Sequence, residues 1–290
     1  MAVYNLGSIN ADRVYRVPHL PAPGETLAAV EYFSGLGGKG ANQSVAAARA
    51  GARVVHIGAV GGDGGWMVDL LAGEGIDTAH IWCSAEPSGH AIINVDDAGE
   101  NAIVIFPGAN RALVAEHVVA GLIDAVPGDW LMLQNETNCQ AEAALVARKM
   151  GMNVAYSAAP FDAMAVQTML PLIKLLILNE VEATQLAGAL GTGVQNLPVP
   201  RTIITKGAAG AVWLEQGKAP VEVPAFSVRV MDTTGAGDTF AGYVVAGLAG
   251  GLQVTEVLRR AAAAAALMVQ KKGTAEAIPL LDEVMAFLNQ

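Results

Sequence analysis

The chain has 290 residues, of which 53% are hydrophobic and 15% charged, and its formal net charge is -10 at pH 7. This length allows one large α/β domain with a sizeable core. The acidic balance argues against a nucleic-acid partner, which needs a basic face, and no uninterrupted apolar run reaches the roughly 18 residues of a membrane span.

The N-terminal stretch MAVYNLGSIN has no basic region before its apolar residues, which is typical of a buried first strand and not of a secretion signal. We therefore expect a cytoplasmic protein. The two cysteines, Cys83 and Cys139, are too few for a disulfide framework or a zinc site, and we expect both to be small buried residues.

Short apolar runs alternate with longer helix-like segments along most of the chain. The predicted strands are VVHIGAV, WLMLQ, NVAYSA, KLLILN, RTIITKG and AVWLEQ, and the predicted helices include ANQSVAAARAGA, AEAALVARKMG and TFAGYVVAGLAGG. Several helices end in a glycine suited to a left-handed cap, at Gly51, Gly75 and Gly151. The alternation predicts an α/β fold with a central, mostly parallel sheet flanked by helices.

Two regions break this alternation, at about residues 10–34 and 88–106. They contain the short runs RVYRV, LAAVEYF, HAIINVDD and NAIVIF, joined by turns such as PAPGE and DDAGEN. Such runs predict a few antiparallel strands inserted into a single domain over residues 1–290. A small sheet of this kind has an apolar face that needs cover from a ligand, from the main body or from a second copy.

The stretch SGLGGKGANQ at 34–43 has the spacing G-x-G-x-x-G, but it fits neither standard nucleotide motif. A dinucleotide site needs an acidic residue at a strand end about 20 positions later, and Asp63 lies instead among glycines. A phosphate-binding loop needs Ser or Thr after Lys39, where Gly40 stands. The glycines, the cation of Lys39 and the amide of Asn42 are groups that can bind a polyol, although a plain tight turn before a helix would also explain them.

A second glycine-rich stretch, DTTGAGDTFAG at 232–242, follows an apolar run and opens a helix-like segment. Gly235, Ala236 and Gly237 would then lie where a helix start presents free amides, which makes an anion hole. Asp238 behind them could accept a proton from an incoming hydroxyl. A helix-capping aspartate would explain Asp238 alone, but not the flanking glycines and threonines.

Together, the two stretches resemble the N-terminal and C-terminal signatures of the ribokinase family of carbohydrate kinases. Further pieces agree in their order along the chain: GSINAD at 7–12, PAPGET at 21–26, GAVGGDGG at 58–65, VDDAGEN at 95–101, LNEVEA at 178–183 and ITKGAAG at 204–210. The resemblance covers most of the chain. It implies a ribokinase-like α/β fold in which the inserted strands form a lid over the sugar and join two copies into a homodimer.

The resemblance also implies the roles of individual residues. Asp238 would be the catalytic base, and the amides of Gly235, Ala236 and Gly237 would stabilise the transferred phosphate. The residues implied in sugar binding are Asn10, Asp12, Gly38, Lys39, Asn42, Glu136 and Asp238. This polar set resembles best the branch of the family that acts on ribose.

ATP and Mg²⁺ are the cofactors that the resemblance implies. Asn179, Thr205, Gly207 and Gly237 would contact ATP, and Asn179 and Glu182 would organise Mg²⁺ through water. Asp232 corresponds to a ligand of a monovalent cation such as K⁺, but Ala277 stands where that site has a serine, so we expect activation by K⁺ to be weak or absent. An alanine run from 261 stands where a polar residue often meets the adenine.

The activity implied by the resemblance is phosphorylation of the primary hydroxyl of a pentose by ATP, with D-ribose as the first candidate. A kinase of another sugar or of a nucleoside is the alternative within the family, and a nucleoside site would need apolar or aromatic groups for the base. A non-catalytic sugar-binding relative is the alternative from another class, and the retained Asp238 argues against it. A dehydrogenase would instead predict binding of a pyridine nucleotide.

Overall fold

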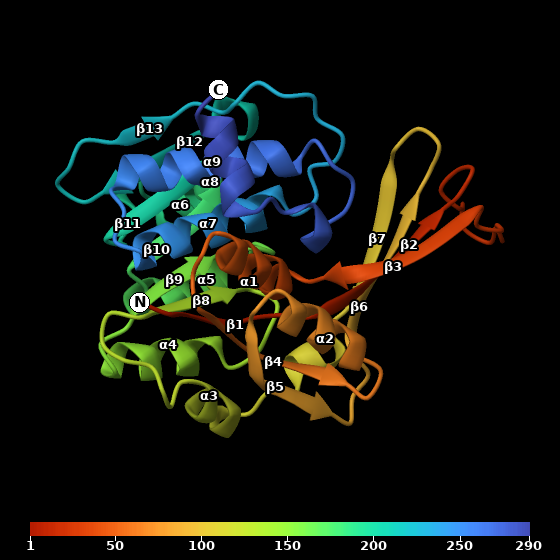
Figure 1. Cartoon of the computed structure of the whole chain (residues 1–290), viewed down its shortest axis with the longest axis horizontal. Coiled ribbons are helices and arrows are strands. Elements are labelled where there is room, and N and C mark those ends of the chain that lie inside the picture. The colour runs from red at the N-terminus through yellow and green to blue at the C-terminus, as the bar shows by residue number, and fades with distance from the viewer.

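The computed structural model describes residues 1–290 as two sheets, a large one inside layers of helices and a small one that projects from it (Figure 1). The main sheet has nine strands in the order β13-β12-β11-β10-β9-β8-β1-β4-β5. Their bounds are β1 Val3–Leu6, β4 Val54–Gly61, β5 Asp77–Ser84, β8 Trp130–Gln134, β9 Asn153–Ser157, β10 Leu175–Asn179, β11 Arg201–Thr205, β12 Ala211–Glu215 and β13 Val221–Val223. All neighbours pair in parallel except β11 with β12 and β12 with β13. The mostly parallel sheet is therefore confirmed.

Helices cover both faces of this sheet. Their bounds are α1 Lys39–Arg49, α2 Gly65–Gly73, α3 Ala115–Gly121, α4 Gln140–Lys149, α5 Ala163–Met169, α6 Glu180–Leu190, α7 Ala236–Ala249, α8 Val254–Met268 and α9 Leu281–Leu288. Short 3-10 turns span Gly108–Arg111, Leu170–Leu172, Val194–Asn196, Gly207–Ala209 and Ala275–Ala277. None of the helices is both long and apolar enough to cross a membrane.

Alternate residues of the buried strands supply two separate cores. In β8, for example, Trp130 and Met132 pack with α1, α7 and α8, whereas Leu131 and Leu133 pack with α3 to α6 on the other face. This period of two follows from the pleat of a strand that is covered on both sides. The first strand, β1, is buried along its whole length, as predicted.

The lid is a four-stranded sheet that extends away from the helical layers (Figure 1). Its order is β3-β2-β6-β7, with β2 Asn10–Arg16, β3 Glu31–Gly37, β6 Gly89–Val95 and β7 Asn101–Phe106. The two hairpin-like pairs, β2 with β3 and β6 with β7, are antiparallel as predicted, but the central pair β2 with β6 is parallel. The inserted sheet is thus mixed, because its two halves enter from separate parts of the chain.

The structure corrects one expectation about side chains. Cys83 lies exposed on the edge strand β5, and Cys139 is partly exposed with φ of 59° before α4. Neither is a buried core residue, because Cys83 lies on the uncovered side of an edge strand and Cys139 is the residue that caps the start of α4. The left-handed glycines predicted at the helix ends are present, with φ of 91° at Gly51, 75° at Gly75 and 76° at Gly151.

Candidate active site

The side chains predicted to bind sugar and to catalyse meet at the carboxyl edge of the main sheet, where the lid begins. Asn10 and Asp12 lie in β2 soon after β1 ends, and Glu136 follows the end of β8. Lys39 and Asp238 lie in the first turns of α1 and α7. Open α/β sheets bind ligands at this edge, because strand ends and helix starts converge there.

Asp238 is a buried carboxylate that α1 holds from two sides. Its Oδ1 accepts a hydrogen bond from Nε2 of Gln43 at 2.8 Å, and its Oδ2 accepts one from Nδ2 of Asn42 at 3.3 Å. The residue is 8% exposed, and the Oδ1 atom of Asn42 has no hydrogen-bond partner. The carboxylate is therefore fixed in direction and keeps lone pairs that could accept further hydrogen bonds, while the Asn42 oxygen is buried without a partner.

The backbone before Asp238 presents two free amides. Gly235 has φ of 81°, and an added Cβ would lie 2.7 Å from the Cε atom of Met268, so only glycine fits this helix start. The amides of Gly235 and Gly237 donate to no group of the protein, whereas the amide of Ala236 donates to the carbonyl of Thr233 at 3.2 Å. Of the three amides predicted to form an anion hole, those of Gly235 and Gly237 are therefore free to donate, and that of Ala236 is not.

Glu136 is oriented by Ser8, which the sequence reasoning missed. The Ser8 hydroxyl donates to Oε2 of Glu136, and the same oxygen accepts the backbone amide of Lys39 at 3.1 Å. Ser8 also accepts the amide of Gly40 at 3.2 Å. The signal was available, because Ser8 lies inside the GSINAD piece, but nothing in the sequence pairs it with Glu136.

Asn10 is oriented by a second missed residue, Asn110, in the turn after β7. Nδ2 of Asn110 donates to Oδ1 of Asn10 at 2.7 Å, and Oδ1 of Asn110 accepts the amide of Ile9 at 2.9 Å. Asn110 is 2% exposed. Because the oxygen of Asn10 is engaged, its amide nitrogen is the group left to donate to a ligand.

One positive charge faces several carboxylates in this site. Burial, and after it the carboxylates of Glu136, Glu276 and Asp238, raise the pKa of Asp12 to about 7, although Lys39 opposes them. The pKa of Lys39 is raised chiefly by the negative charge of Asp238. The site thus has several carboxylate groups and one cation, Lys39. Such a set suits a ligand that donates many hydroxyl hydrogens better than a ligand that is negatively charged where it meets these residues.

The glycines of the 34–43 stretch make room for the site. An added Cβ at Gly37 would lie 2.1 Å from Oδ2 of Asp12, and one at Gly40 would lie 2.3 Å from the Ser8 nitrogen. Gly38 has φ of 91° at the start of α1. The predicted role of Gly38 at the sugar is therefore one of backbone shape. Close packing of the β1–β2 segment with β3 and α1 accounts for Gly37 and Gly40, but not for Gly35, whose added Cβ would meet nothing nearer than 3.9 Å.

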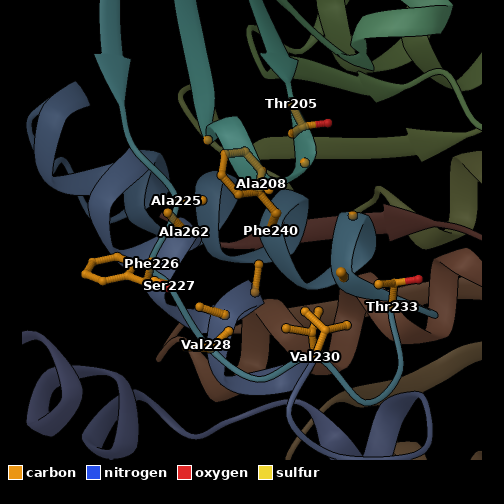
Figure 2. A pocket seen from close by; sticks show the side chains of 17 residues that line it. Thr205, Ala208, Ala225, Phe226, Ser227, Val228, Val230, Thr233, Phe240 and Ala262 are labelled. Atoms are coloured by element: carbon orange, nitrogen blue, oxygen red, sulfur yellow. The ribbon is translucent and has the colours of Figure 1, made fainter.

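A cavity of about 480 Å³ lies beside the anion hole, on the α7 and α8 side of the main sheet (Figure 2). Of the residues predicted to contact ATP, Thr205, Gly207 and Gly237 line this cavity, whereas Asn179 does not. The other lining residues are Ala208, Gly210, Ala225, Phe226, Ser227, Val228, Val230, Thr233, Ala236, Phe240, Ala262, Ala265, Ala266 and Val269. The hydroxyl groups of Thr205 and Thr233 lie away from Phe226, with Val230 beside Thr233 and Ser227 beside Phe226 (Figure 2).

Asn179 and Glu182 form a capping box at the start of α6. The Glu182 amide donates to Oδ1 of Asn179, and the Asn179 amide donates to Oε2 of Glu182, both at 2.8 Å. This accounts for the N-x-x-E spacing in structural terms. Oε1 of Glu182 makes no bond within the protein. The negative charge of Glu182 is one of those that raise the pKa of Lys39.

Asp232 supplies the one side-chain oxygen donor of the predicted site for a monovalent cation. Its Oδ1 accepts the amide of Thr234 at 2.9 Å, and its Oδ2 accepts the amide of Gly273 at 3.4 Å. Ala277 is 2% exposed and carries no side-chain oxygen. These residues do not make up a donor set for K⁺.

Comparisons with known proteins agree with this geometry. Residues 3–281 match the family described as pfkB family carbohydrate kinase. The chain is 39% identical to ribokinase of Haemophilus influenzae, with 98% of this chain and 97% of that protein covered, and 34% identical to ribokinase of Mus musculus, with 96% and 92% covered. The structure of Arabidopsis thaliana ribokinase complexed with ribose and ATP superimposes with a TM-score of 0.88 at 29% identity and covers 100% of both chains.

Proposed function

The chain belongs to the pfkB family of carbohydrate kinases, and from this premise we propose that it transfers the γ-phosphate of ATP to the primary hydroxyl of D-ribose, giving ribose 5-phosphate. One observation carries the proposal. The buried carboxylate of Asp238 lies at a helix start with two free amides, next to polyol-binding side chains on one side and a nucleotide-sized cavity on the other. The names of the relatives, and the ribose and ATP of the Arabidopsis complex, support the choice of substrates.

The reaction follows from this arrangement. Asp238 accepts the proton of the sugar hydroxyl as its oxygen forms a bond to the γ-phosphorus. The bond from that phosphorus to the bridging oxygen breaks, and ADP leaves with the electron pair. The amides of Gly235 and Gly237 donate to the charge that develops on the transferred group.

The sugar end is assigned to side chains that are already oriented. Asn10 presents its amide nitrogen and Glu136 a carboxylate held by Ser8, while Asn42 holds the carboxylate of Asp238. Asp12 and Lys39 complete the set. A site of fixed donors and acceptors discriminates against a sugar that lacks a hydroxyl, because its own polar groups are then left unpaired.

The cavity in Figure 2 is assigned to the nucleotide. Its apolar end, with Phe226, Val228 and Ala262, suits a base, and its polar end at Thr205 and Thr233 adjoins the anion hole. Ala262, Ala265 and Ala266 lie where the alanine run was expected, so the base meets methyl groups on α8.

We assign Mg²⁺ to the phosphate side of the site, where Oε1 of Glu182 makes no bond within the protein. Asn179 and Glu182 would hold it through water, since Mg²⁺ keeps several waters and takes most other ligands from phosphate oxygens. When bound, it neutralises charge on the phosphates. K⁺ does not fit the residues at Asp232 and Ala277, and no step of the reaction is assigned to it.

We also propose that two copies pair through their lids. Five apolar side chains of the lid sheet are each at least half exposed: Phe33, Ile103 and Ile105 on one face, and Tyr32 and Val104 on the other. A second copy offers the same exposed side chains, and a two-fold dimer pairs identical surfaces. Sedimentation measures the molecular mass in solution, and the Val104→Glu variant should have a lower mass than the parent protein. Equal masses of the two proteins would overturn the proposed dimer. The cytoplasmic location stays a prediction.

The test of the function is ADP release from MgATP with ribose, deoxyribose, fructose, 2-keto-3-deoxygluconate and adenosine, each with and without K⁺. Ribose should give by far the highest kcat/KM. Adenosine in first place would favour a nucleoside kinase, and another sugar would move the substrate within the family. Binding of a sugar without turnover would favour a non-catalytic sugar-binding protein.

A further inference from the structure

A line of buried side-chain amides runs from Asp238 into the main sheet, and the catalytic role of Asp238 does not by itself require it. Nε2 of Gln43 donates to Oδ1 of Asp238 at 2.8 Å. Nε2 of Gln134, at the end of β8, donates to Oε1 of Gln43 at 2.7 Å and to Oδ1 of Asn5 at 2.8 Å. The exposed fraction is 0% for Gln43 and Asn5 and 1% for Gln134.

The far end of this line is anchored on backbone carbonyls. Nδ2 of Asn5 donates to the carbonyl of Gly40 and to Oγ of Ser44, both at 2.8 Å. Ser44 lies 2.8 Å from Nδ1 of His56, whose Nε2 lies 3.2 Å from the carbonyl of Gly7. A carbonyl can only accept, so Nε2 of His56 carries the hydrogen and Nδ1 accepts from Ser44. Burial lowers the pKa of His56 to about 4, which agrees with a neutral ring.

The acceptors at the two ends of the line, the carboxylate of Asp238 and the carbonyl of Gly40, determine which way each side-chain amide between them points. The ionised carboxylate of Asp238 can only accept, so Gln43 must turn its nitrogen toward it and its oxygen toward Gln134. The carbonyl of Gly40 can only accept, so Asn5 must turn its nitrogen there and its oxygen toward Gln134. Both ends therefore require the NH₂ group of Gln134 to donate twice.

This arrangement leaves one buried group unpaired. Oε1 of Gln134 has no hydrogen-bond partner, and a Cβ added at Gly7 would lie 2.7 Å from it. An unpaired buried oxygen is unfavourable, but an apolar side chain at position 134 would leave two buried oxygens, Oε1 of Gln43 and Oδ1 of Asn5, without this donor. The two donated bonds therefore require an amide at position 134.

We infer that Gln43 is a positioning residue for the catalytic base and that Gln134 acts through it by fixing the direction of the Gln43 amide. The inference rests on the proposed function, in which Asp238 accepts the proton. Without the bond from Gln43, the carboxylate would retain the longer bond from Asn42 at 3.3 Å and could turn about its side chain. Misorientation of a reacting group is enough to cost about 10- to 100-fold in turnover.

Near-isosteric variants test this. Gln43→Met and Gln134→Met should each lower kcat about 10- to 100-fold and leave the KM for sugar within about threefold. Their melting temperatures should fall by a few degrees. Asn153→Leu is the control, because it removes an amide bond to the Gly128 carbonyl at the opposite edge of the sheet and should leave kcat unchanged. A kcat equal to that of the control in a folded Gln43→Met protein would overturn the inference.

Gln43→Glu separates positioning from folding. The introduced carboxyl group can donate to Asp238 and accept from Gln134 only when it is protonated. The ratio of variant to parent kcat should therefore rise as pH is lowered from about 8.5 to 6. A ratio that does not change with pH would show that the bond to Asp238 does not matter for turnover.

The proposed function and this inference can fail separately. An inactive parent protein, tested in the same ribose assay, would remove the proposed function. An active parent whose Asp238→Asn variant is impaired, together with Gln43 and Gln134 variants that turn over normally, would remove only the inference.

Discussion

The Nδ2 atom of Asn110 donates a hydrogen bond to Oδ1 of Asn10 at 2.7 Å, across 100 positions of sequence. Asn110 follows the last lid strand and Asn10 opens the first one, so this bond joins the two halves of the lid at its base. Gly89 is required beside it, since an added Cβ would lie 2.1 Å from Nδ2 of Asn110. The direction of the Asn10 amide is thereby set by a residue outside the sugar site.

Replacing Asn110 by aspartate should reverse that direction. A carboxylate can only accept, so Asn10 would turn its nitrogen toward position 110 and its oxygen toward the sugar. We expect the Asn110→Asp variant to raise the KM for sugar about 10- to 100-fold while kcat changes less than about threefold. Steady-state kinetics beside Asn153→Asp, at the opposite sheet edge, measures this, and a loss confined to kcat would contradict it.

Asp238→Asn should separate binding from turnover. The amide keeps the size of the carboxylate but cannot accept the hydroxyl proton, so kcat should fall about 100- to 10,000-fold. Sugar affinity measured by calorimetry should stay within about threefold, because the contacts of Asn10, Glu136 and Lys39 remain. Unchanged turnover would remove Asp238 from the mechanism.

Gly37→Ala should impair sugar binding while the protein stays folded. The added methyl would lie 2.1 Å from Oδ2 of Asp12, and a carboxylate at the end of a side chain can move away at low cost to the fold. The displaced Asp12 would no longer face the sugar, so KM should rise at least about tenfold. Gly35→Ala is the control in the same strand, since its nearest contact is Oε1 of Glu276 at 3.9 Å. Equal KM values for the two variants would count against this account.

Much of the fold is readable from local sequence. The runs WLMLQ and NAIVIF coincide with β8 and β7, because strand ends fall at changes in burial or at turns. The run LAAVEYF was less informative: β3 begins at Glu31 and continues through Gly37, where glycines hide the alternation. The parallel pairing of β2 with β6 joins distant segments, and no local pattern reports it. That the whole chain folds as one domain stays a prediction.

The residues of the candidate site also fall into those that the sequence identified and those that it did not. The motifs identified side chains that face the ligands, such as Asp238 and Lys39, and the structure brings them together. They did not identify Ser8, Asn110 or Gln134, because a hydrogen-bond partner is chosen by the fold and not by spacing. They also did not show that the Ala236 amide donates to the carbonyl of Thr233. The assigned roles of all these residues stay predictions until the variants are measured.

Turnover should not depend on K⁺. Of the two side chains of the predicted cation site, Asp232 and the residue at 277, only Asp232 carries an oxygen, because Ala277 has a methyl group. We expect kcat in K⁺ to stay within about twofold of kcat in tetramethylammonium at equal ionic strength, so that screening of charges is matched. Activation of more than about fivefold by K⁺ would mean that backbone carbonyls complete a cation site without the serine.

Without sugar, Asp12 should make the protein less stable as pH rises. The unfolded chain loses this proton near the ordinary value of 3.8, whereas burial and the charges of Glu136, Glu276 and Asp238, opposed by Lys39, raise the pKa in the folded protein to about 7. Between these values the folded state binds more protons, so the contribution of Asp12 is fully present below pH 3.8 and is lost as pH rises through about 7.

Denaturant titrations of the parent protein and Asp12→Asn from pH 5 to 8.5 measure this loss. The variant should gain about 1 to 3 kcal/mol in its free energy of unfolding relative to the parent over that range. Asp97→Asn removes an exposed lid carboxylate beside Arg16 and should follow the parent at every pH. A gap between Asp12→Asn and the parent that stays constant with pH would show that Asp12 is already ionised in the folded protein at pH 5.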